Sequence, residues 1–179
     1  LFTHEHADHI HGIDDLRALT VRRSGPLPLY GEAPTLDTLR SRFPYVFDAA
    51  FRPLPGTTRP EGLPIEVRAG EVFAVGNVEV LPLAVPHGRA SVLGYRVGDI
   101  PYITDAKEIP PASMAALRGV RVLVLNALLR RSHPTHLSIA EAIATAQQVG
   151  AERTYFTHLT HDNAHAALAA ELPPGIMPA

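Results

Sequence analysis

The sequence of 179 residues contains no cysteine, which excludes disulfide bonds and thiolate metal ligands. It contains no apolar run long enough to cross a bilayer and no signal-peptide pattern, so we expect a cytoplasmic protein with no membrane partner. Basic residues form no block or arm and the net charge is −2, so the usual footprint of a nucleic-acid-binding protein is missing. With 46% hydrophobic residues, the chain predicts one globular domain over residues 1–179.

Four side chains that suit metal ions occur within six residues near the start of the chain: His4, His6, Asp8 and His9. An extended segment places side chains two residues apart on one face, so His4 and His6 can bind one ion together. Asp8 and His9 fall where the chain turns into a helix, and we expect them to point elsewhere, toward a second ion. Imidazole and carboxylate suit zinc, manganese or iron better than metals that prefer soft ligands. The segment therefore predicts a metal site.

Turn residues and hydrophobic spacing divide the next part of the chain into short elements. They predict a helix at 12–20, a strand at 27–30 and a helix at 35–42. Residues 43–64 contain five prolines and two glycines, and predict an irregular loop or lid. A meander of antiparallel strands is then expected, with strands at 65–68, 71–75, 78–85 and 92–97.

Strands and helices alternate in the last part of the chain. Strands are predicted at 101–104, 121–125 and 154–156, and helices at 112–118, 139–149 and 163–172. Ser138 and Glu141 form a capping box, which starts a helix at Ile139, and Gly150 ends it. A block of strands followed by this alternation fits an α/β (α+β) fold, with sheet layers and helices packed outside them.

Three further candidate ligands come at the ends of apolar strands: His87, Asp105 and His158. Loops at strand ends commonly carry functional residues on a rigid scaffold. His136 lies in a loop two residues before the capping serine, and we expect that loop to face the same rim. His133 is interpreted as a loop residue, and for His161 a supporting role and a plain surface position are equally open.

The spacing H-x-H-x-D-H, followed in order by histidine, aspartate and histidine, resembles the signature of the metallo-β-lactamase-fold hydrolases. The resemblance implies an αββα sandwich, with its first strands expected upstream of Leu1 and a last strand expected after Ala179. It implies two metal ions, zinc or manganese, with iron also a candidate. One ion would be held by His4, His6 and His87, the other by Asp8, His9 and His158, with Asp105 bridging them.

The segment around His136 resembles the phosphodiesterase branch of that family, which includes tRNA 3′-processing nucleases and the phosphoribosyl 1,2-cyclic phosphate phosphodiesterase of phosphonate breakdown. In that branch the corresponding histidine contacts the phosphate or protonates the leaving oxygen. The resemblance therefore implies catalytic roles for His136 and Asp8, beside a water that the two metals activate to hydroxide. We expect a small phosphodiester, cyclic ones included, as substrate.

Other functions use the same metal centre and stay open at this point. An RNA-processing nuclease of the tRNA 3′-end type would need phosphate contacts from Lys and Arg, and no basic arm is present. A thioesterase or lactamase would not need a residue like His136. A module stabilised by metals without catalysis is the alternative outside the enzymes. The sequence leaves the substrate, the choice of metal and a homodimeric state undecided.

Overall fold

The protein is described by a computed structural model over residues 1–23 and 25–179. The chain divides into two compact units, Leu1–Arg68 and Ala69–Ala179, and each has a hydrophobic core of its own. The single domain expected over 1–179 stays a prediction. Among the helices of the described residues, none combines the length and apolar character needed to span a bilayer.

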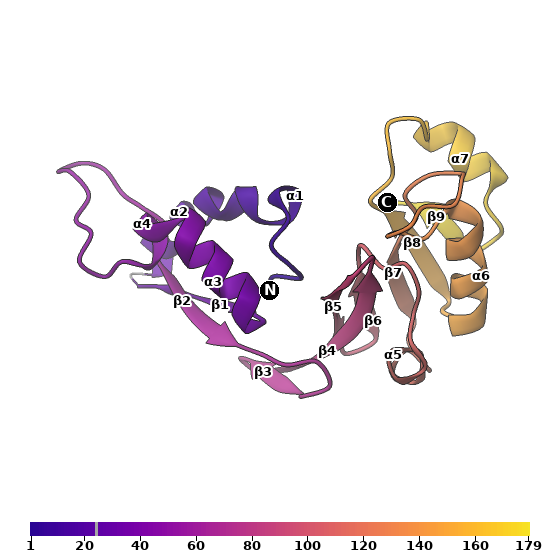
Figure 1. Cartoon of the computed structure of the whole chain (residues 1–179), viewed down its shortest axis with the longest axis horizontal. Helices are drawn as coiled ribbons and strands as arrows, with labels where there is room; N and C mark the ends of the chain where they lie inside the picture. Colours follow the sequence, from indigo (N-terminus) through magenta and orange to yellow (C-terminus); the bar gives the residue numbers. More distant parts are fainter. Residues whose placement is uncertain (24) are drawn as a thin grey trace. The chain divides into compact units, whose positions relative to one another are not determined.

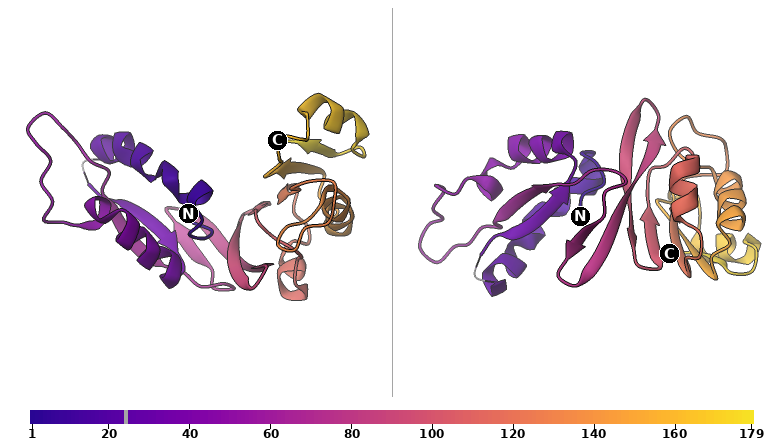
Figure 2. Two further views of the ribbon diagram at one scale, coloured as in Figure 1. Left: turned by 45° about the horizontal axis from the view of Figure 1, so that its top comes forward. Right: turned by 90° about the horizontal axis from the view of Figure 1, so that it is seen from below.

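The first unit packs helices against a pair of short strands (Figures 1 and 2). Its elements are α1 (Ala7–Ile10), the 3₁₀ helix η1 (His11–Leu16), α2 (Arg17–Arg23), β1 (Leu27–Gly31), α3 (Ala33–Arg42), α4 (Pro44–Phe47) and β2 (Gly62–Glu66). The strands β1 and β2 run parallel. A parallel pair needs a long crossover, and α3, α4 and the loop that follows supply it.

Two expectations for this unit need correction. The strand expected at 65–68 is β2, which starts at Gly62 and pairs with β1 instead of joining the antiparallel meander. The segment 43–64 is irregular only in its middle, because it contains the helical turn α4 and the start of β2. A side chain at position 62 would place its Cβ 2.5 Å from Leu29, so glycine allows the close approach of the two strands there.

The core of the first unit forms where helical and strand residues meet. Leu36 and Leu39 lie three residues apart on α3, so both face the same side of the helix. Leu39 is fully buried and Leu36 nearly so. The buried residues of this core are Ile10, Ile13, Leu29, Leu36, Leu39 and Val46. Helix α1 contributes Ile10 to it, so the core fixes the helix that follows the histidine-rich segment.

The second unit contains a seven-stranded sheet in the order β3-β4-β5-β6-β7-β8-β9 (Figure 2). Its strands are β3 (Phe73–Val75), β4 (Val78–His87), β5 (Ala90–Val97), β6 (Ile100–Ile103), β7 (Val122–Asn126), β8 (Arg153–Thr157) and β9 (Ile176–Pro178). Its helices are α5 (Pro111–Ala116), α6 (Ile139–Val149) and α7 (His165–Glu171). Pairing is antiparallel from β3 to β6 and parallel from β6 to β9.

Helix α6 is the element that the sequence predicts best. Ser138 is its N-cap, its side chain accepts a hydrogen bond from the Glu141 backbone, and the Glu141 carboxylate accepts one from the Ser138 backbone. Both halves of the capping box are therefore present. Its apolar side packs into the core of the second unit through Ile139, Ala142 and Ala146. The loop just before α6, which carries His136, is thus fixed at its end.

Strand β9 was not predicted. It has three residues, follows a Pro-Pro-Gly turn and has no alternating pattern of its own. It forms because its backbone completes the ladder beside β8, where Thr154 pairs with Ile176. The meander and the alternating part otherwise agree with the prediction within about three residues at each end, the usual uncertainty of helix and strand limits. The mixed α/β fold expected from the sequence is confirmed.

Candidate metal centre

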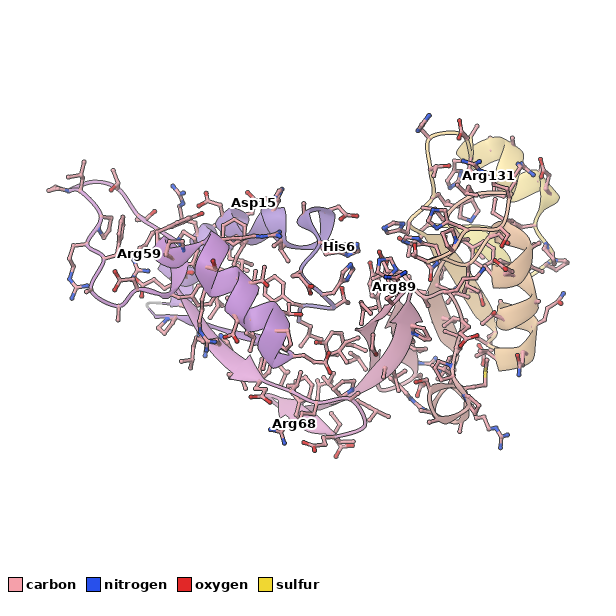
Figure 3. The ribbon with its side chains drawn as sticks, viewed as in Figure 1. His6, Asp15, Arg59, Arg68, Arg89 and Arg131 are labelled. Carbon is pink, nitrogen blue, oxygen red and sulfur yellow. The ribbon has the colours of Figure 1, made fainter. Side chains whose placement is uncertain are left out.

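Two histidines of the first unit lie side by side on an extended segment. His4 is almost completely buried, and its Nε2 is 3.0 Å from Nδ1 of His6. The backbone of His6 is extended, with φ −65° and ψ 149°, and α1 begins at the next residue (Figure 3). The prediction that alternate positions bring these two imidazoles to one face is therefore confirmed.

The other two candidate ligands of the first unit lie in the first turn of α1. Asp8 Oδ2 is 3.2 Å from Nε2 of His9. The ring of His9 is 4.3 Å from that of His4, centroid to centroid. Within the first unit these candidate ligands therefore form two pairs, His4 with His6 and Asp8 with His9, and the expectation that the second pair serves another ion stays a prediction.

Hydrogen bonds to β1 and α3 hold this segment in place. The backbone N–H of Phe2 donates to the carbonyl oxygen of Tyr30 at 2.8 Å, which ties the chain to β1 just ahead of the histidines. The carbonyl oxygen of Glu5, between His4 and His6, accepts a hydrogen bond of 3.1 Å from the Arg42 guanidinium. The candidate ligands are therefore presented by a backbone anchored at two points.

Asp105 is the centre of the candidate ligands in the second unit. Its carboxylate is 2% exposed, and three imidazoles face it. Oδ2 lies 3.1 Å from Nε2 of His136 and 3.9 Å from Nε2 of His87, and Oδ1 lies 3.4 Å from Nε2 of His158. These groups come from the ends of β4, β6 and β8 and from the loop before α6. The sheet therefore brings together residues up to 71 positions apart in the sequence.

The backbone is strained at two of these positions. Asp105 has φ +59° and His158 has φ +57°, and among the described residues no other non-glycine position has a positive φ. Such conformations cost about 1–3 kcal/mol each and persist only where the surroundings impose them. Both residues directly follow a strand or lie within two residues of its end. Strain therefore coincides with the candidate ligands, as it commonly does at functional sites.

A network of backbone hydrogen bonds imposes the conformation of the Asp105 loop. The buried amide of Asn126 accepts from the N–H of Ala106 at 2.9 Å and donates to its carbonyl oxygen at 3.1 Å. That same carbonyl accepts from the N–H of Leu137 at 2.8 Å, and the N–H of Lys107 donates to Pro86 at 2.8 Å. The loops that carry His87, Asp105 and His136 are therefore joined through their backbones.

The turn between β4 and β5 packs directly on the loop before α6. Nδ1 of His87 is 3.1 Å from the carbonyl oxygen of Thr135, so this contact can orient the imidazole and leave Nε2 facing Asp105. Gly88 has φ +65°, and a Cβ there would lie 2.7 Å from Cγ2 of Thr135. Arg89, labelled in Figure 3, follows it in this two-residue turn, and both residues are exposed. The turn has no space for a side chain at Gly88.

His136 is buried and is not one of the ligands that the family resemblance implies. Its Nδ1 is 2.7 Å from Oγ1 of Thr135 and 3.2 Å from Nδ1 of His133. Burial lowers the pKa of His136, while the hydrogen bond and charge of Asp105 oppose that shift. The imidazole is therefore predominantly uncharged at neutral pH. The contact with His133 was missed, because a loop gives no periodic signal from which the position of a ring can be inferred.

The remaining histidines lie outside these groups within the described residues. The ring of His161 is 95% exposed and is 3.5 Å from the carboxylate of Asp162. His11 packs edge-on against Phe43 with ring centroids 6.2 Å apart. His165 is the first residue of α7 and is exposed. None of the three joins the groups around His4 or Asp105.

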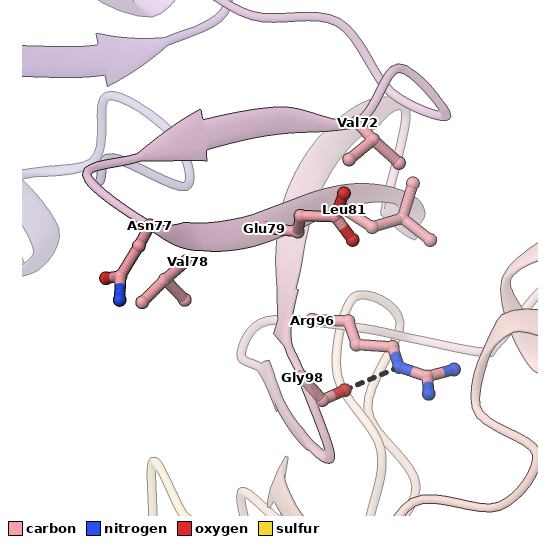
Figure 4. A pocket seen from close by; sticks show the side chains of 7 residues that line it. All are labelled: Val72, Asn77, Val78, Glu79, Leu81, Arg96 and Gly98. Atoms are coloured by element: carbon pink, nitrogen blue, oxygen red, sulfur yellow. Dashed lines mark hydrogen bonds between the residues drawn. The ribbon is translucent and has the colours of Figure 1, made fainter.

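A hollow of about 670 Å³ beside the β4–β5 hairpin contains none of the candidate ligands (Figure 4). Its lining residues are Val72, Asn77, Val78, Glu79, Leu81, Arg96 and Gly98. The Arg96 guanidinium donates to the carbonyl oxygens of Gly98 and Ala116. The one cationic side chain among these lining residues is thus engaged by the backbone, and we assign no reaction to this hollow.

The chain belongs to the family described as beta-lactamase superfamily domain, which it matches over residues 1–159. The metallo-β-lactamase fold expected from the H-x-H-x-D-H spacing is therefore confirmed. The chain is also similar to the crystal structure of a new diphosphatase from the PhnP family, with 36% identity and a TM-score of 0.87. That similarity covers 99% of this chain and 65% of the diphosphatase chain.

Two other relatives are informative. The chain is 40% identical over 181 residues to a protein of Porphyromonas gingivalis named octanoyltransferase, and the match covers 98% of this chain. The chain spans only 35% of the length of that relative. The short form of human tRNase Z shares the fold, with 19% identity, a TM-score of 0.65 and coverage of 90% of this chain and 72% of that one.

The side chains present fit a divalent metal ion. In the second unit, one ligand atom each from Asp105, His136 and His158 lie within 4.8 Å of one another, which is close enough to surround a single cation. Nitrogen and oxygen donors without thiolates suit zinc, manganese and iron. Together with the family, these groups indicate a site for divalent metal.

Proposed function

We propose that the chain is a phosphoric ester hydrolase that uses two divalent metal ions and acts on small phosphodiesters or diphosphates. The observation that carries the proposal is the position of His136. Its Nε2 is 3.1 Å from the carboxylate of Asp105, yet it is not among the ligands that the family resemblance implies. Protonation of a leaving oxygen requires a proton donor close to the metal centre. An imidazole that lies beside the proposed bridging carboxylate and is not itself assigned as a ligand is placed for that role.

The proposed ligand set follows the family resemblance. One ion is assigned to His4, His6 and His87, and the other to Asp8, His9 and His158, with Asp105 shared between them. Two ions so held activate a water and neutralise charge that develops on the substrate. Zinc or manganese is the proposed metal, with iron as the alternative.

His136 acts on the leaving group in this proposal. When the hydroxyl of Thr135 donates to Nδ1, the proton of the neutral ring lies on Nε2, which faces Asp105. From there the neutral ring can donate a hydrogen bond to an oxygen that departs from phosphorus, and the imidazolium form, with a proton on each nitrogen, can transfer its Nε2 proton to that oxygen and return to the neutral ring. Desolvation keeps the pKa of His136 below its usual range, so the protonated ring is a stronger acid than a solvated one.

The diphosphatase relative supports phosphorus as the reacting centre. It is 36% identical to this chain, and its name specifies a diphosphate as substrate. Diphosphates and phosphodiesters present the same problem, because in both an oxygen leaves from a charged phosphoryl group. The proposal therefore includes both substrate classes.

Two other activities are not proposed. The name octanoyltransferase belongs to a relative of which the match covers 35%, so octanoyl transfer is not carried over to this chain. The likeness to tRNase Z, at 19% identity, concerns the fold. RNA processing relies on many phosphate contacts from Lys and Arg, and the chain carries no basic block.

The test is hydrolysis of a panel of cyclic phosphodiesters, linear phosphodiesters and diphosphates with added zinc, manganese or iron. We expect His136→Ala to keep both metals and lose about 10²–10⁴ in rate on substrates with poor leaving groups. The loss should be smaller for nitrophenyl esters, whose leaving group hardly needs a proton. His161→Ala is the matched control, because that ring is exposed and outside both groups.

Three results would count against the proposal. Equal losses for good and poor leaving groups would assign His136 to phosphate binding. Unchanged activity of His136→Ala on every ester would remove it from the reaction. Hydrolysis of thioesters or lactams alone would replace phosphorus by carbon as the reacting centre.

A further inference from the structure

Three donor groups converge within the second unit without any residue of the first. Asp105, His136 and His158 each bring one ligand atom to within 4.8 Å of the other two. Nε2 of His136 is 3.1 Å from one carboxylate oxygen of Asp105, and Nε2 of His158 is 3.4 Å from the other. The two imidazoles lie almost parallel, at 25°, with ring centroids 5.0 Å apart. Both rings therefore present the same nitrogen to one carboxylate.

The contacts of His136 suit a metal ligand as well as a general acid. A histidine that binds a metal through one ring nitrogen usually makes a hydrogen bond through the other. Here Nδ1 of His136 has Oγ1 of Thr135 at 2.7 Å, and Nε2 faces the carboxylate of Asp105. In the tautomer with the proton on Nδ1, that N–H donates a hydrogen bond to the hydroxyl oxygen of Thr135, and the lone pair of Nε2 points to Asp105.

We propose that Asp105, His136 and His158 form an alternative position for one divalent ion, in which His136 serves as a ligand. The inference rests on the proposed function, because it matters only if His136 otherwise acts on the leaving group. Two imidazoles and a carboxylate with one open position suit zinc, which prefers four ligands. Manganese favours a larger set of oxygen ligands and is disfavoured here.

This position competes with the proposed two-metal centre. It shares Asp105 and His158 with the second ion of that centre, and it replaces the ligands Asp8 and His9 by His136. Nε2 cannot hold a metal and a transferable proton at once. The protein would then carry its full number of ions and yet lack the proton donor. Excess zinc should therefore inhibit activity toward poor leaving groups more strongly than excess manganese does.

The binding test uses the full chain carrying Asp8→Asn and His9→Gln, which weakens the first unit's share of the second ion. After dialysis against zinc, we expect this variant to retain two ions per chain. Adding His136→Gln should reduce the number to one. Adding His161→Gln instead should leave it at two, because that ring lies outside both groups. Loss of the second ion in the Asp8→Asn/His9→Gln variant itself, or its retention after His136→Gln, would overturn the proposal.

A second measurement identifies the bond itself. With cadmium-113 in place of zinc and nitrogen-15 in the histidines, the Asp8→Asn/His9→Gln variant should show one-bond coupling between the metal and Nε2 of His136. Absence of that coupling in the folded, cadmium-loaded variant would contradict the assignment. Neither readout depends on catalysis. Failure of the wild type to hydrolyse any phosphoric ester would refute the proposed function while leaving both metal measurements interpretable.

Discussion

Asn126 makes both of its side-chain hydrogen bonds to the backbone of one residue, Ala106, at 2.9 and 3.1 Å. The amide is completely buried at the end of β7, and Ala106 directly follows the strained Asp105. A single side chain therefore supports the conformation in which Asp105 meets three imidazoles.

Asn126→Ala should lower both stability and metal affinity. It leaves the N–H of Ala106 without its partner in a buried site, and an unsatisfied buried group costs about 1–3 kcal/mol. Urea unfolding of the metal-free protein measures the first effect, and zinc competition with a chelator measures the second. Asn77→Ala, in an exposed turn of the same unit, is the control. Metal affinity unchanged in a destabilised Asn126→Ala protein would show that Asn126 supports the fold and not the carboxylate.

Gly88→Ala should be more destabilising than Gly98→Ala. Both positions have positive φ, +65° and +57°, so alanine is strained at each. Only at Gly88 would the new Cβ also meet Thr135, at 2.7 Å, and overpacking of this kind typically costs about 1–3 kcal/mol more. The difference between the urea unfolding midpoints of the two variants measures the cost of the contact between the new Cβ and Thr135. Equal losses would mean that the loop before α6 moves aside without cost.

The stability of the second unit should fall in acid through Glu141. Its hydrogen bonds to Lys107 and to the Ser138 backbone lower the pKa of this carboxyl from 4.5 to about 2. A lowered pKa in the folded state contributes stability above the unfolded value, and that contribution disappears as pH falls from about 5 toward 2. Unfolding in urea across this range should show a decrease that Glu141→Gln reduces. Because the side chain is 39% exposed, solvent screening makes the effect smaller than the shift alone implies.

Metal ions should stabilise the folded chain. The candidate ligands come together only on folding, so binding adds to stability by linkage, about 2.7 kcal/mol at a free metal concentration 100 times the dissociation constant. The thermal midpoint should therefore rise with zinc or manganese and drop with a chelator. His6→Ala should reduce the rise and bind fewer ions, whereas His161→Ala should behave as the wild type. A thermal midpoint that does not change with added metal would contradict metal binding by these residues.

Metal analysis that finds fewer than two ions in the active protein would contradict the two-metal centre.

Local signals in the sequence were sufficient for much of the fold. Helix α6 was predicted to the residue, because Ser138, Glu141 and Gly150 mark its ends by chemistry that acts over a single turn. Helix α3 was predicted to within two residues, with Pro34 in its first turn. The ends of β6 and β8 were also found, and with them Asp105 and His158.

What the sequence did not reveal depends on contacts between distant segments. Strand β2 begins with glycine, leucine and proline, so its sequence does not predict a strand there. It forms by pairing with β1, which is distant in the sequence. The strained Asp105 is followed by Ala106, whose backbone is held by Asn126, 21 positions after Asp105. Likewise, the contact of His133 with His136 depends on the path of a loop. The candidate ligands could be proposed from their spacing and from the family resemblance, and their assignment stays a prediction, but the backbone contacts that position them could not be inferred.

The close packing of Gly88 on Thr135 restricts how this protein can diverge. An insertion between His87 and Ala90 would separate the hairpin from the loop that carries His136, whereas residues 48–58 of the first unit are exposed between α4 and β2, where changes of length are expected to cost less. The surface beside His87 can therefore change through the exposed side chain of Arg89 more readily than through growth of the turn.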